Sequence, residues 1–178
     1  MKTSTKFYAI AAVTLAIFSG QITQAQTVEP LKEGKGFKIG FGVSGGITQD
    51  SSPFDYGLGA DARLQLDLSN YVALTATGGY TRLFAKEGLA DFDFIPAKGG
   101  VKVFPIGNLY GAGEIGAGFG IEDGSKTMLI WSAGLGYEWK NGLDLSARYE
   151  GYTQDSASST YVPQTGQFAI RLAYGFKL

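Results

Sequence analysis

Charged residues with the chemistry of an acid–base site occur in the second half of the chain. They are Glu114, Glu138, Arg148, Glu150 and Arg171. Carboxylates held near cations can act in general acid–base catalysis, but structural ion-pair networks bring the same groups together. Because no catalytic motif surrounds these residues, we interpret them as a structural charge network.

A nucleophilic enzyme is not expected. The chain has no histidine and no cysteine, so it lacks the base and the thiolate on which activated serine and cysteine sites depend. A Ser–Lys pair is formally open, yet Ser132 and Ser146 are more simply small residues of a packed sheet. We predict no catalytic residue.

Two glycine patterns match the dinucleotide-binding fingerprint as strings. They are Gly111-x-Gly113-x-x-Gly116 and Gly40-x-Gly42-x-x-Gly45. The fingerprint binds a pyrophosphate only where a strand turns into a helix, and both strings lie within alternating, strand-like sequence. We therefore predict no cofactor.

A metal site would have to use oxygen ligands alone. Glu87, Asp91 and Asp93 could bind calcium or bridge lipopolysaccharide through divalent ions, but their spacing is not that of an EF-hand. A solvated acidic loop is the simpler interpretation, so no metal site is predicted.

The first 25 residues have the features of a secretory signal peptide. Lys2 and Lys6 precede an apolar stretch at 9–18, and Thr23-Gln24-Ala25 resembles a cleavage site. We predict a signal peptide at 1–25, a short periplasmic segment at 26–35 and one domain at 36–178. Without Lys2 and Lys6, the 15 basic residues become 13 against 16 acidic ones, a balance too weak to suggest a nucleic-acid partner.

The remaining chain alternates between apolar and polar residues in eight segments. Twenty-seven glycines, five prolines and the absence of a helical repeat also favour an all-β protein. In the last segment Phe168, Ile170, Leu172, Tyr174 and Phe176 share one face. The predicted fold is an eight-stranded antiparallel up-and-down transmembrane β-barrel.

The polar faces of these segments carry nearly balanced charge. The predicted lumen network consists of Asp61, Arg63, Lys98, Lys102, Glu114, Glu138, Arg148, Glu150 and Arg171. Balance is expected inside a closed barrel because an unpaired buried charge is costly. Long connections at 49–55, 83–91, 122–126 and 153–165 alternate with tight turns at 69–70, 105–108 and 140–142.

Two segments are irregular. Around FDFIPAK the alternation set by Phe92 and Phe94 conflicts with that of Ile95 and Ala97, which predicts a β-bulge beside Pro96. The third segment is weakened by Tyr71 and Ala73, which fall on its polar face.

The barrel could close with either face inward. Eleven glycines lie on the polar face and four on the apolar face, and an eight-stranded barrel has room inside only for side chains that fill it. Small residues therefore favour the polar face as the lumen. A secreted or periplasmic lipocalin-like carrier, with the apolar face inward, is the alternative.

Three stretches carry a resemblance to a known family. They are FIPAKGGVKVF at 94–104, GLDLSARYEGY at 142–152 and RLAYGFKL at 171–178. The chain resembles the small outer-membrane β-barrel proteins of Bacteroidetes-type bacteria, which share their architecture with OmpA-type and OmpX-type barrels. Leu178 departs from the aromatic residue that ends many such barrels.

The resemblance implies a place in the outer membrane, contacts with its lipids and lipopolysaccharide, and the barrel-assembly machinery as a partner during insertion. We expect a non-enzymatic scaffold that presents extracellular loops, with a role in adhesion or envelope integrity. A narrow pore and a lipid-modifying enzyme are further alternatives.

Overall fold

The computed structural model describes residues 36–49, 52–86, 90–121, 125, 127–153 and 165–178. The expected signal peptide at 1–25 and the segment at 26–35 lie outside these residues. No helix long and apolar enough to cross a membrane occurs in the described part of the chain.

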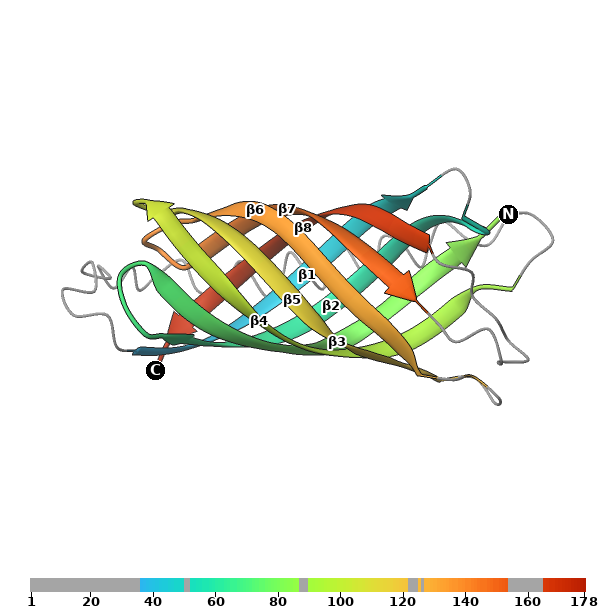
Figure 1. Cartoon of the computed structure of the whole chain (residues 1–178), viewed down its shortest axis with the longest axis horizontal. Coiled ribbons are helices and arrows are strands. Elements are labelled where there is room, and N and C mark those ends of the chain that lie inside the picture. Colours follow the sequence, from blue (N-terminus) through green and yellow to red (C-terminus); the bar gives the residue numbers. More distant parts are fainter. Residues whose placement is uncertain (1–35, 50–51, 87–89, 122–124, 126, 154–164) are drawn as a thin grey trace, which may run out of the picture.

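Eight antiparallel strands form one closed barrel (Figure 1). Each strand pairs with its neighbours in the sequence, and β1 pairs with β8 to complete the ring. The strands are β1 (Gly36–Thr48), β2 (Phe54–Asp67), β3 (Val72–Ala85), β4 (Phe92–Ile106), β5 (Leu109–Gly120), β6 (Met128–Glu138), β7 (Leu143–Thr153) and β8 (Thr165–Lys177). The predicted all-β, eight-stranded, up-and-down barrel is confirmed.

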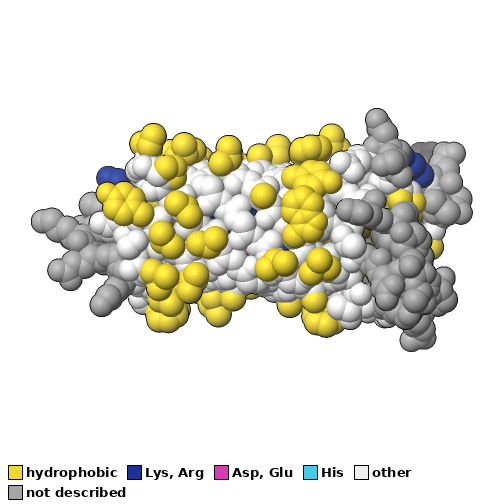
Figure 2. Space-filling model, viewed as in Figure 1, with side chains coloured by type: hydrophobic (Ala, Val, Ile, Leu, Met, Phe, Trp, Pro, Cys, Tyr) yellow, Lys and Arg dark blue, Asp and Glu magenta, His cyan; other side chains and the backbone are white. Residues whose placement is uncertain are grey.

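The outer wall consists of the apolar face of every strand. Large hydrophobic side chains are exposed along it, including Leu135 at 67% and Phe168 at 60%. Figure 2 shows hydrophobic side chains over the visible wall, while the Lys and Arg side chains that stand out lie near its ends. The period-two alternation read from the sequence therefore closes with its polar face inward.

The two ends of the barrel differ. The tight connections β2–β3, β4–β5 and β6–β7 meet at one end, here called the turn end, where the chain also terminates (Figure 1). Gly107 and Gly142 in these turns have φ of 54° and 93°, a region that favours glycine. The longer connections lie at the opposite, loop end, and most of the 153–165 loop is outside the described residues.

The predicted bulge beside Pro96 is wrong. Pairing of β3 with β4 runs to Gly78–Ala97 and resumes at Thr81–Phe94 in the same register. A register shift occurs instead between Val103 and Ile106, where β4 meets β5 near the turn. The missing proline donor interrupts the ladder without adding a residue, so the alternation continues through it.

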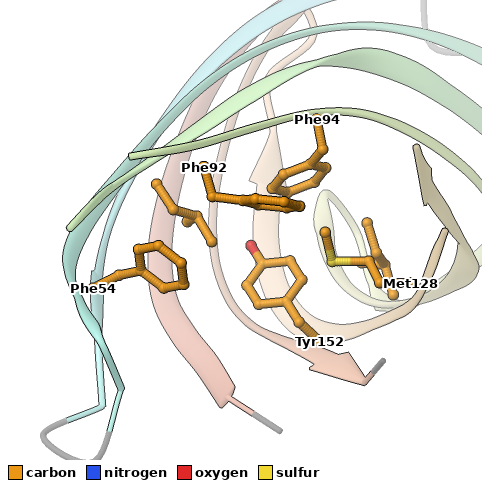
Figure 3. Close-up of a cluster of buried hydrophobic side chains, with 7 residues drawn as sticks. Phe54, Phe92, Phe94, Met128 and Tyr152 are labelled. Carbon is orange, nitrogen blue, oxygen red and sulfur yellow. The ribbon is translucent and has the colours of Figure 1, made fainter. Parts of the chain in front are cut away.

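Phe92 and Phe94 point into the barrel, which resolves the conflict in the sequence pattern. They belong to a buried apolar cluster at the loop end, shown in Figure 3. Its members are Phe54, Leu83, Phe92, Phe94, Met128, Ile130 and Tyr152. The lumen is therefore polar for most of its length and apolar beneath the loops. In β3, Ala73 also faces inward and is 1% exposed, while Tyr71 lies just before the strand and is 66% exposed.

Candidate functional site

The charged side chains of the strands gather in the lumen. Because successive side chains of a strand point to opposite faces, residues two or four apart share the interior. Lys98 and Lys102 on β4 are 6% and 2% exposed, and the neighbouring strands supply the carboxylates that meet them. All nine residues of the predicted network form ion pairs in the structure.

One group of ion pairs lies next to the apolar cluster. Lys98 Nζ is 2.6 Å from Glu150 Oε2 and 3.5 Å from Glu114 Oε2. Arg63 Nη2 lies 2.8 Å from Glu114 Oε1, and Arg148 Nη2 lies 3.4 Å from Glu150 Oε2. Each carboxylate therefore faces two cations, which offsets much of the cost of burying it.

A second group lies toward the turn end. Lys102 Nζ is 2.7 Å from Asp144 Oδ2 and 3.0 Å from Glu138 Oε2. Lys38 Nζ lies 2.6 Å from Glu138 Oε1 and 3.1 Å from Asp67 Oδ2. Two ammonium groups and three carboxylates thus form one connected network.

Arg171 connects to this second group from β8. Its side chain is 1% exposed, and its guanidinium Nε donates to Asp61 Oδ2 at 2.8 Å. Its Nη1 lies 3.9 Å from Asp144 Oδ1. The two groups of ion pairs together occupy the lumen between the turn end and the apolar cluster.

Two tyrosines in the lumen were not predicted as site residues. Tyr110 donates to Asp144 Oδ1 at 2.7 Å and lies beneath the Lys102 ammonium, which is 4.1 Å from the ring centroid. Tyr152 donates to Glu150 Oε1 at 2.7 Å. Both stand in the inward register of their strands, so the alternation itself was the signal that could have identified them.

The two serines lie among the same groups. Ser132 donates a long hydrogen bond of 3.4 Å to Glu114 Oε2, and Ser146 is 9% exposed. The glycine patterns at 40–45 and 111–116 lie within β1 and β5, away from any strand-to-helix turn. The carboxylate that Ser132 contacts is itself paired with Arg63 and Lys98.

A cavity of about 240 Å³ lies inside the turn end. Lys38, Lys102 and Arg171 are among its lining residues, and Gly40 and Gly175 form part of its wall. We call this space the turn-end cavity. It shows that the charged side chains fill the lumen incompletely on this side.

Two of the acidic residues considered for calcium, Asp91 and Asp93, contact an arginine outside the lumen. Asp91 Oδ2 and Asp93 Oδ1 are 3.1 Å and 3.5 Å from the guanidinium of Arg82, whose side chain is 43% exposed. Glu87 lies outside the described residues. Among the residues that the structure describes, no group of three or more acidic side chains is placed to hold a metal ion.

The solved structures that this chain resembles include transmembrane β-barrels. Ail of Yersinia pestis aligns with a TM-score of 0.55 at 18% identity, over 80% of this chain and 99% of Ail. The N-terminal barrel domain of Pseudomonas aeruginosa OprF gives 0.54 at 13% identity, over 78% and 97%. A de novo designed transmembrane β-barrel gives 0.51 at 18% identity, over 80% and 97%.

These similarities define the class of fold. The chain has the fold of a small eight-stranded transmembrane β-barrel, and the matched proteins are covered almost completely. No protein-family model and no curated protein matches the chain.

Proposed function

We propose that the chain is an outer-membrane protein of Gram-negative bacteria, a non-enzymatic scaffold whose packed lumen holds the barrel rigid while its loops face the cell exterior. One observation carries the proposal: ion pairs lie inside, and large apolar side chains lie outside. Exposed apolar surface of this extent is costly in water and favourable against lipid. A closed barrel also satisfies its backbone hydrogen bonds within the membrane.

Aromatic side chains on the outer wall support the same placement. Tyr137 packs on Trp139, and Tyr174 on Phe176, near the turn end. Tyr56 stacks on Phe84 near the loop end, with ring centroids 4.5 Å apart. Aromatic girdles at the two interfaces are characteristic of transmembrane barrels.

The remaining parts of the proposal follow from this placement. Residues 1–25 act as a cleaved signal peptide, 26–35 as a periplasmic segment, and the barrel-assembly machinery inserts 36–178. The outer wall contacts membrane lipids and lipopolysaccharide, and no nucleic acid is bound. We also propose kinship with the small outer-membrane barrels of Bacteroidetes-type bacteria, on the stretches noted above.

Attachment is the proposed role of the loops. Ail is described as an attachment invasion locus protein, and one of its structures contains the heparin analogue sucrose octasulfate. This chain shares the scaffold, and we propose that its loops mediate adhesion or support the envelope.

A lipocalin-like carrier is the weaker candidate. Such a protein needs an apolar lumen for its ligand, whereas Lys102, Glu150 and Arg171 fill this one. The apolar cluster at the loop end is packed with side chains and is not an open apolar pocket in the described part of the barrel.

Spin labels on the refolded protein in lipid vesicles test the proposal. Labels at Leu145 and Leu172, both on the outer wall, are expected to be accessible to oxygen and shielded from a water-soluble relaxation agent. Labels at Gly134 or Arg148 lie on the lumen face, so they should not show the high accessibility to oxygen that contact with lipid produces. The reverse pattern would exclude membrane insertion in this orientation. Cell fractionation tests the location independently.

A further inference from the structure

The apolar cluster at the loop end draws its side chains from β2, β3, β4, β6 and β7. Each of these side chains is at most 5% exposed, and Figure 3 shows the labelled ones turned toward a common space inside the barrel. The ring centroids of Phe94 on β4 and Tyr152 on β7 are 5.6 Å apart. Because β4 and β7 are not neighbours in the barrel, the cluster spans the lumen instead of lining one side of it.

Glycines on β5 let the cluster reach the wall on that side. A Cβ added at Gly118 would lie 2.7 Å from Ile130 Cδ1 and 3.1 Å from Phe94 Cδ2. A Cβ added at Gly120 would lie 3.4 Å from a ring carbon of Phe92. The cluster therefore packs directly against the backbone of β5.

A polar side chain fills the remaining sector beside β1 and β8. Gln167 on β8 is 4% exposed, and its amide nitrogen donates a hydrogen bond to the Tyr152 hydroxyl. A Cβ added at Gly46 on β1 would lie 2.9 Å from the Gln167 amide oxygen. All eight strands therefore contribute to, or closely approach, one packed layer. We call this layer, which consists of the apolar cluster and Gln167, the loop-end layer.

The hollows at the two ends of the barrel share no lining residue among those that the structure describes. The turn-end cavity opens between the tight turns, since the exposed residues Asn70, Gly107 and Lys140 belong to its lining. A hollow of about 230 Å³ at the loop end includes Trp131 in its lining and meets the loop-end layer only at Tyr152. Neither hollow passes through this layer.

An apolar layer across a lumen is a barrier to ions. An ion that enters such a layer loses its hydration and gains no equivalent partner, which is costly. Hydrophobic constrictions block conduction in channels because they exclude water. The Tyr152 hydroxyl does not provide a way through, since it already donates to Glu150 on the turn-end side.

From these features we propose that the loop-end layer seals the lumen, and that the turn-end cavity is a blind vestibule which water and small ions enter from the turn end alone. Every side chain of the seal belongs to a strand. Only the assignment of the two sides to the cell exterior and the periplasm rests on the proposed function. Cell fractionation tests that location independently, so a failure there would leave the seal standing.

Single cysteines test the seal, because the chain contains no cysteine of its own. Ser132 is the next inward position after Ile130 on β6, on the turn-end side of the seal, and Gly175 lines the turn-end cavity. T127C marks the loop end and K140C the turn end, since both positions are exposed. The protein is refolded into vesicles, and a small membrane-impermeant methanethiosulfonate is either added outside or sealed inside.

The two marker variants identify which arm delivers the reagent to which end. Preparations are used in which each arm labels one marker. We expect G175C to be labelled in the arm that labels K140C, and neither G175C nor S132C in the arm that labels T127C. Labelling of S132C or G175C from the loop end of the intact barrel would overturn the proposal.

Opening the seal should admit the reagent. We expect F94A to raise the rate at which S132C is labelled from the loop end by roughly tenfold or more, because the substitution leaves a cavity in the seal. M128A is a second, smaller deletion in the same layer and should act in the same direction. F168A removes the same ring from the outer wall, where Phe168 is 60% exposed, and should leave the rate unchanged.

The heat-dependent shift in electrophoretic mobility identifies the folded fraction of each variant, and labelling is counted in that fraction alone. An unchanged rate for S132C in folded F94A and M128A would refute the seal. An equal rise in F168A would also refute it, because general loosening of the barrel would then account for the access.

Discussion

Lys98 Nζ lies 2.6 Å from Glu150 Oε2, although their strands β4 and β7 are not neighbours in the barrel. Both side chains are buried. The contact therefore spans the lumen and links opposite parts of the wall. Its presence explains how an eight-stranded barrel can be filled by charged residues without an open channel.

Removal of one partner from this pair should be strongly destabilising. We expect E150A to lower the free energy of unfolding by about 3–5 kcal/mol, because Lys98 would keep a buried charge with less compensation. The measurement is urea unfolding in lipid vesicles, in which the folded fraction is monitored by the heat-dependent shift in electrophoretic mobility. The double variant K98M/E150L should recover the part of the loss that comes from Lys98, whereas Arg148 still lacks its Glu150 partner. A double variant as unstable as E150A would contradict this account.

Glycines on the two faces of β5 should differ in their tolerance of a methyl group. A Cβ at Gly116, inside the barrel, would lie 2.0 Å from the Ala97 carbonyl oxygen. A Cβ at Gly113, on the outer face, would lie 4.0 Å from the Ser132 carbonyl oxygen. We expect G116A to cost about 1–3 kcal/mol through overpacking and G113A to cost much less. Both residues belong to the fingerprint-like string, so the comparison tests whether close packing inside the barrel requires glycine at one of its positions. Similar unfolding midpoints for the two variants would argue against it.

The apolar cluster at the loop end should contribute as a protein core does. Phe94 is 0% exposed, and its ring contacts those of Phe92 and Tyr152. Replacement by alanine leaves a cavity, so F94A should cost about 3–5 kcal/mol in vesicle unfolding experiments. F168A is the control, because Phe168 is 60% exposed on the outer wall and lipid can fill the space it leaves. If F168A were the more damaging change, the cluster would not act as a core.

An arginine introduced on the outer wall should destabilise the barrel more strongly the deeper it lies in the bilayer. Leu172 lies in the middle of β8, whereas Phe176 is near its turn end. Arginine at the bilayer midplane of a barrel costs about 2–4 kcal/mol, and near an interface about 0–1 kcal/mol. We therefore expect L172R to be clearly less stable than F176R in vesicles. If each variant had the same free energy of unfolding in vesicles as in detergent, the penalty would not come from the bilayer. That result would mean that lipid does not cover this wall.

The sequence determined the strands and the faces of this protein. Alternation with period two marks which side chains share a face, and the terminal strand from Phe168 to Phe176 shows it without interruption. The excess of glycine on the polar face also identified the lumen, because space inside eight strands is limited. These properties depend on local geometry and size, which a sequence displays directly.

Only the tertiary structure decided which residues meet. Lys98 and Glu150 are 52 residues apart on strands that are not hydrogen-bonded, so no local pattern could pair them. Phe92 and Phe94 suggested a bulge because their alternation was read as conflicting with that of Ile95 and Ala97, whereas closure of the barrel brings them against Tyr152 in an apolar cluster. The turn-end cavity likewise arises from how eight strands close around a common centre. Such contacts depend on the register and tilt of the whole barrel, which alternation along one strand does not specify.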